Sequence, residues 1–382
     1  MVTPGPLGEH LDSLALVDHH VHGAFRDDVA DATFEETITE SDRGRLPGQS
    51  AFDSQVGFAL LRWCAPLLDL EPHTSKDAYL ARRHELGAEE VNRRMLRAEG
   101  ASAFLVDTGF AATALLTPDE MAAATEADAR EIVRLEAVAE EVAAKGPTAS
   151  SFASLFAERL AARLEGAVGT KSIVAYRCGF DVDPTRPAAS AVQRAAGDWL
   201  DRIERDGTIR LSDPVLSRHL LWSGIDAGLP LQLHAGYGDT DLDLHRANPL
   251  LLTNFLRLTE PSETPVVLLH CYPFHREAGY LAQMFPHVFF DVGLALNYAG
   301  GHAATIVAES LEVAPFAKQL FSSDAWGASE LHYLGARLWR TAMTRVLGAL
   351  VDHDEWSLAN ARRVATMIGV DNASFLYGLS TS

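Results

Sequence analysis

Two histidines stand one residue apart in the segment Val17-Asp18-His19-His20-Val21-His22, which follows an apolar run. Alternate side chains of a strand share a face, so we expect His20 and His22 to point together and His19 to pack away from them, outside the core. Two imidazoles on one face of a strand can hold one metal ion. The pair alone has limited specificity, because the chain contains 15 histidines.

Three further ionisable side chains stand in a similar place. His234, His270 and Asp324 are the last residues of three runs that are rich in Leu, Val and Phe. Such runs are typical of buried parallel strands. One or two polar strand ends are ordinary structural features, but His or Asp at the end of four strands predicts a common site that can bind a metal ion.

The elements that must position these residues alternate along the chain. Short apolar runs are separated by longer segments of helical periodicity, which indicates parallel β-α-β units. The number of runs favours an α/β fold, the closed (β/α)₈ TIM barrel, whose active sites lie at the carboxyl ends of the strands. The expected strands are Leu14–Asp18, Ala103–Val106, Ile132–Leu135, Ser172–Tyr176, Pro230–Leu233, Val266–Leu269, Val288–Asp291 and Leu320–Ser323. The expected helices include Phe152–Leu164, Ala188–Ile203, Val215–Ala227 and Glu330–Leu347.

The connection after the first strand is much longer than one crossover helix requires. Residues 23–100 therefore predict a helical insertion over the mouth of the barrel, as a lid or a wall of the pocket. Its middle, residues 52–68, is apolar and aromatic with helical spacing. We find no repeat or flexible linker, and we expect residues 1–382 to form one domain.

The composition excludes several classes of partner. The chain has 52 acidic and 32 basic residues, a net charge of −20, which disfavours nucleic acid and anionic membranes. Its three cysteines show no Cys-x-x-Cys spacing, so reduced thiols are expected. Neither a targeting segment nor an apolar stretch of membrane-spanning length is apparent, which favours a cytoplasmic protein that acts on a small molecule. A homo-oligomer is compatible with this composition.

These motifs resemble those of the amidohydrolase superfamily. More closely, the chain resembles the amidohydrolase-related (amidohydrolase 2) family, which includes the amidohydrolase-like domain fused to glutamine synthetase in some plants and fungi. The similar passages are the Val17–His22 motif, Lys171–Arg177, Leu233–Asp239 and Asn372–Leu379. The resemblance implies a divalent ion held by His20, His22, His234 and Asp324. It also implies that His270 either binds a second ion or hydrogen-bonds the substrate.

Lys171 bears on the number of ions. In some members of the superfamily a lysine on the fourth strand is carboxylated and bridges two ions, whereas other members use one ion. The resemblance favours Lys171 as a ligand, with an ordinary ion pair as the alternative. Near it, Tyr176 is expected to contact the substrate, and Arg177 and Arg62 are candidates to hold a substrate carboxylate.

Three weaker candidates complete the set. Glu136, which would end the third strand, could orient a ligand. His302 and His332 follow the seventh and eighth expected strands, and both could lie near the mouth of the barrel.

The expected chemistry is metal-assisted hydrolysis of a C–N amide bond, with Zn²⁺ as the expected ion. Asp324 would accept the proton of the attacking water, and His270 or Tyr176 would polarise the carbonyl oxygen. The resemblance suggests a γ-glutamyl-type amide as substrate. Two alternatives stay open: a metal-dependent non-oxidative decarboxylase of the same superfamily, and a metal-binding barrel without catalytic activity.

Overall fold

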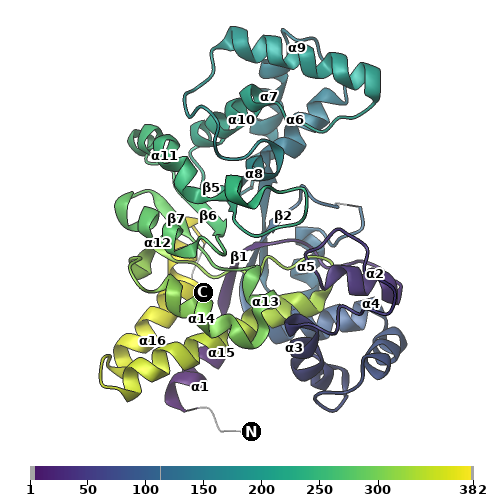
Figure 1. The fold of residues 1–382 in the computed structure, drawn as a ribbon, viewed down its shortest axis with the longest axis vertical. Coiled ribbons are helices and arrows are strands. Elements are labelled where there is room, and N and C mark those ends of the chain that lie inside the picture. Colours follow the sequence, from purple (N-terminus) through teal and green to yellow (C-terminus); the bar gives the residue numbers. More distant parts are fainter. Residues whose placement is uncertain (1–4, 112, 380–382) are drawn as a thin grey trace.

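Seven parallel strands form a curled sheet in which each strand pairs with its neighbour in sequence (Figure 1). The computed structural model describes residues 5–111 and 113–379. Every residue of β1, β5 and β6 is buried, because helices cover the sheet outside and side chains fill it inside. The strands are β1 (Leu16–Val21), β2 (Ala101–Asp107), β3 (Asp128–Arg134), β4 (Gly169–Ser172), β5 (Leu231–Ala235), β6 (Val266–His270) and β7 (Val288–Phe290).

An extended segment, residues 319–325, occupies the eighth position of the barrel. The N–H of Leu320 donates to the carbonyl of Phe290 in β7 (3.0 Å), and the N–H of Asp324 donates to the carbonyl of His20 in β1 (3.1 Å). The segment was expected as the regular strand Leu320–Ser323, but it is not regular. The φ angle of Asp324 is +48°, which interrupts the strand geometry just where the barrel closes.

The fourth strand ends earlier than the sequence predicts. β4 stops at Ser172, and a helical turn, α8 (Val174–Arg177), follows. The hydroxyl of Ser172 accepts from the N–H of Val174 (3.1 Å), and a carboxylate oxygen of Glu136 accepts from the N–H of Ile173 (3.1 Å). These side chains take the place of strand partners, so the expected strand Ser172–Tyr176 was wrong beyond its first residue, Ser172.

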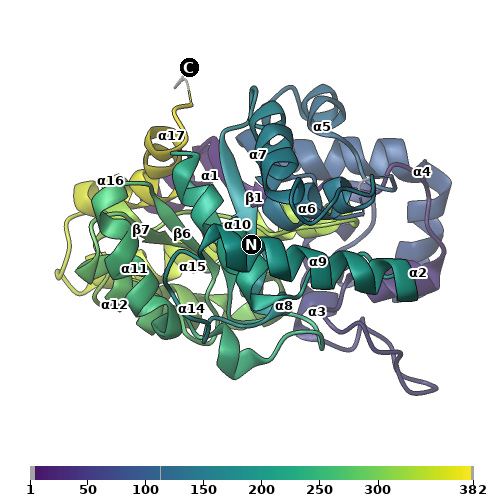
Figure 2. The same cartoon turned by 90° about the horizontal axis from the view of Figure 1, so that it is seen from above.

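Helices surround the sheet, and α6, α7, α9 and α10 gather at the top of Figure 1. Viewed from above, the helices lie on both sides of the strands (Figure 2). The expected helices agree with α7, α9, α10 and α15 to within a few residues. Besides α8, the α-helices outside the insertion in the described residues are α1 (Pro6–Ser13), α5 (Pro118–Thr125), α6 (Leu135–Ala143), α7 (Phe152–Arg163), α9 (Ala189–Asp206), α10 (Pro214–Asp226), α11 (Thr253–Thr259), α12 (His275–Met284), α13 (Ala295–Ala299), α14 (Ala303–Ser310), α15 (Ser329–Asp352), α16 (Leu358–Thr366) and α17 (Asn372–Leu376).

The long connection after β1 is helical. It contains α2 (Asp31–Thr37), α3 (Gln55–Trp63), a short 3₁₀ helix (Ala65–Leu68) and α4 (Lys76–Glu99). α4 bends at Gly87, whose φ of +78° lies in the left-handed region that favours glycine. α4 packs along α15, which anchors the insertion to the barrel.

A separate apolar cluster fills the lower interior of the barrel. It is closed by Tyr377, which follows α17. None of the helices in the described ranges is both long and apolar enough to cross a membrane. The cluster consists of Val17, Ala103, Leu105, Ile132, Val267, Leu269, Leu320, Ala373 and Tyr377.

Candidate metal centre and its pocket

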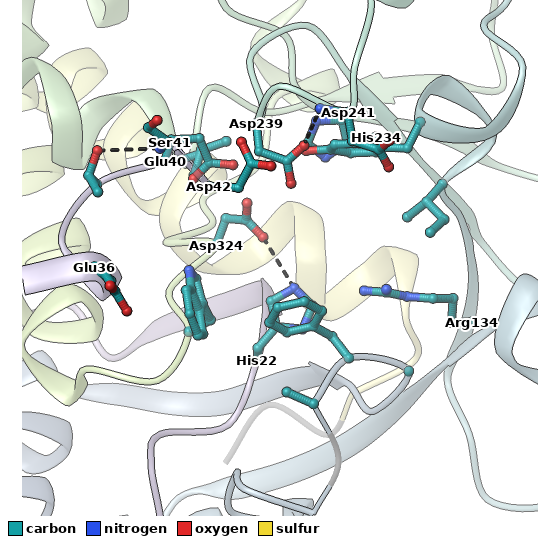
Figure 3. A pocket seen from close by; sticks show the side chains of 18 of the residues that line it. His22, Glu36, Glu40, Ser41, Asp42, Arg134, His234, Asp239, Asp241 and Asp324 are labelled. Atoms are coloured by element: carbon teal, nitrogen blue, oxygen red, sulfur yellow. Dashed lines mark hydrogen bonds and ion pairs between the residues drawn. The ribbon is translucent and has the colours of Figure 1, made fainter. Parts of the chain in front are cut away.

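A cavity of about 640 Å³ opens at the carboxyl ends of the strands (Figure 3). Its floor contains His22, Lys171, His234 and Asp324, and its wall includes residues 39–44 of the insertion. The chain order of the strands brings these residues together, because the carboxyl ends of parallel strands meet at one end of a barrel. The volume suits a small molecule.

Asp324 is the centre of a group of buried histidines. Its Oδ1 lies 3.0 Å from Nε2 of His20 and 3.8 Å from Nε2 of His22, and its Oδ2 lies 3.3 Å from Nε2 of His270. The contact with His22 is drawn in Figure 3. The ends of β1 and β6 and the eighth segment therefore meet at one carboxylate.

Hydrogen bonds fix the orientation of two of these rings. Nδ1 of His20 lies 2.7 Å from Oε1 of Gln232, and Nδ1 of His22 lies 3.0 Å from the carbonyl oxygen of Asp107. Both acceptors require a proton on Nδ1, so Nε2 of each ring carries the free lone pair. Such outer contacts are typical of histidines that bind metal ions.

His19 does not point out of the core as the alternation predicted. It is fully buried, with Nε2 3.0 Å from Oδ2 of Asp291 and Nδ1 3.2 Å from the hydroxyl of Tyr377. The pairing of β1 with β2 is irregular between Asp18 and Val21, which breaks the strict alternation and allows both His19 and His20 to face inward.

His270 and His234 lie side by side, with ring centroids 4.7 Å apart. Both ring nitrogens of His270 are buried without a hydrogen-bond partner in the described chain. His234 places Nε2 2.9 Å from the carbonyl oxygen of Tyr237, and its ring lies 4.6 Å from that of Tyr176. An unpartnered buried imidazole is costly, and a cation that accepts its lone pair would remove that cost.

The donor set fits a divalent cation. Two overlapping groups place their ligand atoms within 4.8 Å of one another: His20, His270 and Asp324, and His20, His22 and Asp107. Burial lowers the pKa of His20 and of His270, and lowers that of His22 to about 4, so the imidazoles are neutral at neutral pH. Neutral imidazole and carboxylate are common ligands of Zn²⁺ and similar ions.

Asp324 sits in a strained turn that its neighbours hold. The carboxylate of Asp18 accepts from the N–H of Ser323 (3.0 Å) and from its hydroxyl, and that hydroxyl accepts from the N–H of Ala325 (3.1 Å). Burial raises the pKa of Asp324 to about 6, which is suitable for a group that gives and takes protons near neutral pH.

Comparisons with known proteins agree with this geometry. A family model described as amidohydrolase matches residues 96–379. The chain belongs to the amidohydrolase family. Protein fluG of Emericella nidulans is 28% identical over 428 aligned residues, which cover 100% of this chain and 47% of the fungal protein. The chain therefore spans about half the length of this curated relative.

Solved structures of similar shape come from bacteria. A candidate metal-dependent hydrolase of Lactobacillus casei superposes with a TM-score of 0.85 at 29% identity, over 97% of both chains. The uronate isomerase of Thermotoga maritima has a TM-score of 0.63 at 13% identity, over 97% of this chain and 96% of that one. At that identity the isomerase shows the same fold and nothing more.

In this family member Lys171 is buried at the base of the pocket. Its Nζ lies 2.9 Å from Nε2 of His20 and 3.9 Å from Oδ2 of Asp107. Burial lowers the pKa of Lys171 to about 8. The lysine therefore lies beside His20, one of the expected metal ligands.

Asp107 was missed by the sequence analysis. Arg134 donates to its Oδ2 from Nε (3.0 Å) and Nη2 (2.6 Å). Burial raises the pKa of Asp107, but the charges of Arg134 and its other neighbours outweigh burial and hold the pKa below its usual value. Asp107 ends β2 as Asp324 ends its own apolar run, so the signal that found Asp324 could have found it.

Of the residues expected near the substrate, Tyr176 and Arg177 line the pocket and Arg62 does not. Arg62 lines a different groove, where its guanidinium stacks on Trp63 at 4.3 Å from the ring centroid. The insertion does line the pocket, but through residues 39–44, and not through the apolar stretch 52–68. The expectation that Arg62 faces the pocket was therefore wrong.

The three weaker candidates lie elsewhere. Glu136 lies in the first turn of α6 and accepts from the hydroxyl of Ser172 (2.6 Å), so it supports β4 and not a ligand histidine. His302 is exposed beyond α13. His332 is fully buried on α15 and does not line the pocket. Two further carboxylates line the pocket: Asp239, which closes the family-like passage Leu233–Asp239 but was not singled out, and Glu40, which had no sequence signal beyond its place in the insertion.

Proposed function

We propose that this protein is a metal-dependent hydrolase that cleaves the C–N bond of a small amide. The observation that carries the proposal is the convergence of His20, His22 and His270 on Asp324 at the floor of a cavity. The likeness to the Lactobacillus casei hydrolase supports it. By analogy with the amidohydrolase-like domains described above, the candidate substrate is a γ-glutamyl-type amide.

We assign the ligand roles to His20, His22, His234 and Asp324, with His270 as a further ligand or a substrate contact. His234 belongs to neither compact group, but its ring adjoins that of His270. A divalent ion held there, which we propose to be Zn²⁺, supplies Lewis acidity that polarises a carbonyl group and lowers the pKa of water to about 7.

The side chains of the pocket supply the rest of the chemistry. Asp324 accepts a proton at a carboxylate oxygen from the attacking water and passes it to the leaving nitrogen. Tyr176, whose ring lies beside His234, donates from its hydroxyl to the substrate carbonyl. Arg177 holds a carboxylate of the substrate.

We also propose a role for Lys171 and for the insertion. Lys171 becomes a ligand when its Nζ adds to CO₂, which forms a carbamate and releases a proton; this carbamate would hold a second ion. Residues 23–100 form one domain with the rest of residues 1–382, a proposal supported by the packing of α4 on α15.

A substrate panel tests the proposal. Zinc-loaded and metal-free protein are incubated with simple amides, γ-glutamyl amides and aromatic carboxylic acids, and ammonia, amine and CO₂ are measured. We expect ammonia or amine release that depends on the metal. Release of CO₂ would identify a decarboxylase, and no turnover by metal-replete protein would indicate a binding protein.

A metal count tests the ligand roles. Elemental analysis of the wild type after incubation with zinc and bicarbonate should give one ion more per chain than Lys171→Met. An exposed control, Lys145→Met, should match the wild type. Equal counts in Lys171→Met and the wild type would remove Lys171 from the ligand set.

A further inference from the structure

The charges around the cavity are separated. Glu40, from the loop after α2, and Asp239, from the loop after β5, stand on one wall together with Asp42, and Arg134 stands on the opposite wall (Figure 3). Both walls belong to the same small cavity, so a ligand in it meets both signs of charge.

Most of the other charged groups of the pocket are already paired. Arg134 is committed to Asp107 through two nitrogens, and Arg210 pairs with Asp241. In the described ranges, no Lys or Arg nitrogen lies within 4.0 Å of a carboxylate oxygen of Glu40. Two unpaired carboxyl groups in one cavity repel each other unless a cation or a proton lies between them.

Three tyrosines lie near enough to Glu40 for its charge to act on them, and of these Tyr176 lines the cavity. Its carboxyl group is hydrogen-bonded to Tyr298, whose ring centroid lies 5.9 Å from that of Tyr237. Burial and then the charge of Glu40 raise the pKa of Tyr298, of Tyr237 and of Tyr176, which places all three near this carboxylate. Carboxylates among aromatic rings are typical of sites that bind ammonium groups.

Contacts between two loops bring Glu40 to Asp239. The hydroxyl of Thr240 donates to the carboxylate of Asp42, and Nε of Arg43 donates to the Thr240 hydroxyl (3.0 Å). Because Asp42 and Arg43 closely follow Glu40, and Thr240 follows Asp239, these bonds hold the two carboxylates on the same wall.

Arg177 gives a second, independent indication of a ligand. Its side chain is 9% exposed and lines the cavity, and one guanidinium nitrogen lies 3.2 Å from Glu140. Its buried Nε has no hydrogen-bond partner in the described chain. A buried, unpartnered guanidinium nitrogen is costly, and an anionic ligand group that accepts from it would remove the cost.

We propose that Glu40, with Asp239 and Tyr176, binds a primary ammonium group of the substrate, while Arg177 binds its carboxylate. The substrate is then an amide of an amino dicarboxylic acid, and the protein recognises both its ammonium group and its carboxylate. The inference rests on the proposed amide hydrolysis and adds that Glu40 binds the ammonium group of the substrate.

Three matched methylamides test it on the zinc-loaded wild type. γ-Glutamyl methylamide carries both charged groups, glutaric acid monomethylamide lacks the ammonium group, and 4-aminobutyric acid methylamide lacks the carboxylate. We expect each deletion to lower kcat/KM by about 10- to 100-fold, the range of a charge-assisted hydrogen bond. Equal kcat/KM for the first two compounds would overturn the ammonium site.

Variants connect the preference to Glu40. Glu40→Gln should raise KM for γ-glutamyl methylamide by the same factor and leave the glutaric acid monomethylamide unaffected. Glu89→Gln, an equal change of charge at an exposed residue of α4 that does not line the cavity, should keep the wild-type preference. A Glu40→Gln protein that keeps the full preference contradicts the proposal.

Binding without turnover separates this proposal from the proposed function. Calorimetry on the zinc-loaded wild type should give tighter binding of glutamate than of glutarate, with the difference lost in Glu40→Gln. If glutamate binds more tightly but no amide is hydrolysed, the proposed hydrolase activity is wrong and the ammonium site stands. If amides are hydrolysed but glutamate binds no more tightly than glutarate, the ammonium site is wrong and the hydrolase activity stands. If neither hydrolysis nor a preference for glutamate is found, both proposals are wrong.

Discussion

The amide oxygen of Gln232 lies 2.7 Å from Nδ1 of His20, and the amide nitrogen donates to the hydroxyl of Tyr377 at 2.8 Å. The same nitrogen also donates to the carbonyl oxygen of His19 at 2.8 Å. Two acceptors on the nitrogen side determine which way the amide faces, so its oxygen must face His20. Gln232 thereby keeps Nε2 of His20 without a proton, as a metal ligand requires.

We predict that Gln232→Leu lowers metal affinity by about 10- to 100-fold, because His20 loses the acceptor that orients its ring. Competition with a chelator for zinc measures the change. Gln232→Glu retains an acceptor for Nδ1 and should bind zinc more tightly than Gln232→Leu. If Gln232→Leu binds zinc as tightly as the wild type, the hydrogen bond does not orient the ligand.

We predict that Asp324→Asn loses turnover to a greater extent than metal. Asparagine keeps the shape and one oxygen but cannot accept a proton at neutral pH. Loss of a general base typically costs about 10²- to 10⁴-fold in kcat. Elemental analysis and kcat are measured on the same preparation. A metal-replete variant with a near wild-type rate would transfer the proton role to His270.

We predict that Arg177→Gln and Arg62→Gln differ in their effect on substrates. Arg177 lines the cavity, so Arg177→Gln should raise KM for a substrate with a carboxylate by about 10- to 100-fold. Arg62 lines a separate groove, so Arg62→Gln should leave KM and metal content as in the wild type. Steady-state kinetics measure KM for both variants. If Arg177→Gln and Arg62→Gln have equal KM values, Arg177 does not bind the substrate.

We predict that the burial of His332 lowers the free energy of unfolding as the pH falls below 6.5. Burial lowers the pKa of His332 to about 3, whereas the pKa of an exposed histidine is near 6.5. Below pH 6.5 the unfolded chain therefore binds the proton first, and the stability present above that pH is lost as the pH falls toward 3.

Denaturant titrations between pH 7 and pH 4 measure this dependence. His332→Leu should flatten the fall in the free energy of unfolding by about 1.4 kcal/mol per pH unit at most, the value for one proton. The other buried histidines titrate in both proteins, so the difference between the two curves isolates His332. Curves of equal slope would show that this ring is not the source.

The strand ends could be predicted from the sequence because a buried strand gives a simple pattern of residues. A buried parallel strand appears as an apolar run, and the polar residue that closes it, such as His234 or His270, stands at the barrel mouth. Asp107 carried the same pattern and was overlooked. The helix pattern likewise predicted α9 and α15 closely, because their apolar faces repeat with the helical period.

Other features depend on contacts that no local pattern contains. β4 ends where Glu136 accepts a backbone N–H, and that carboxylate comes from another element. His19 faces inward because the pairing of β1 is irregular. Glu40 reaches the pocket only because its loop meets the loop that contains Thr240. Arg62 was misplaced for the same reason, since its position depends on how the insertion folds.

Tyr377 determines when this site can become complete during synthesis. Its hydroxyl is the hydrogen-bond partner of both His19 and Gln232, yet it is made 145 residues after Gln232. At about 5–20 residues per second, a ribosome needs roughly 7–30 s to cover that distance. Through that interval the nascent chain carries His20 and His22 without the contact that holds Gln232, so the site reaches its full affinity for metal only after Tyr377 has been made.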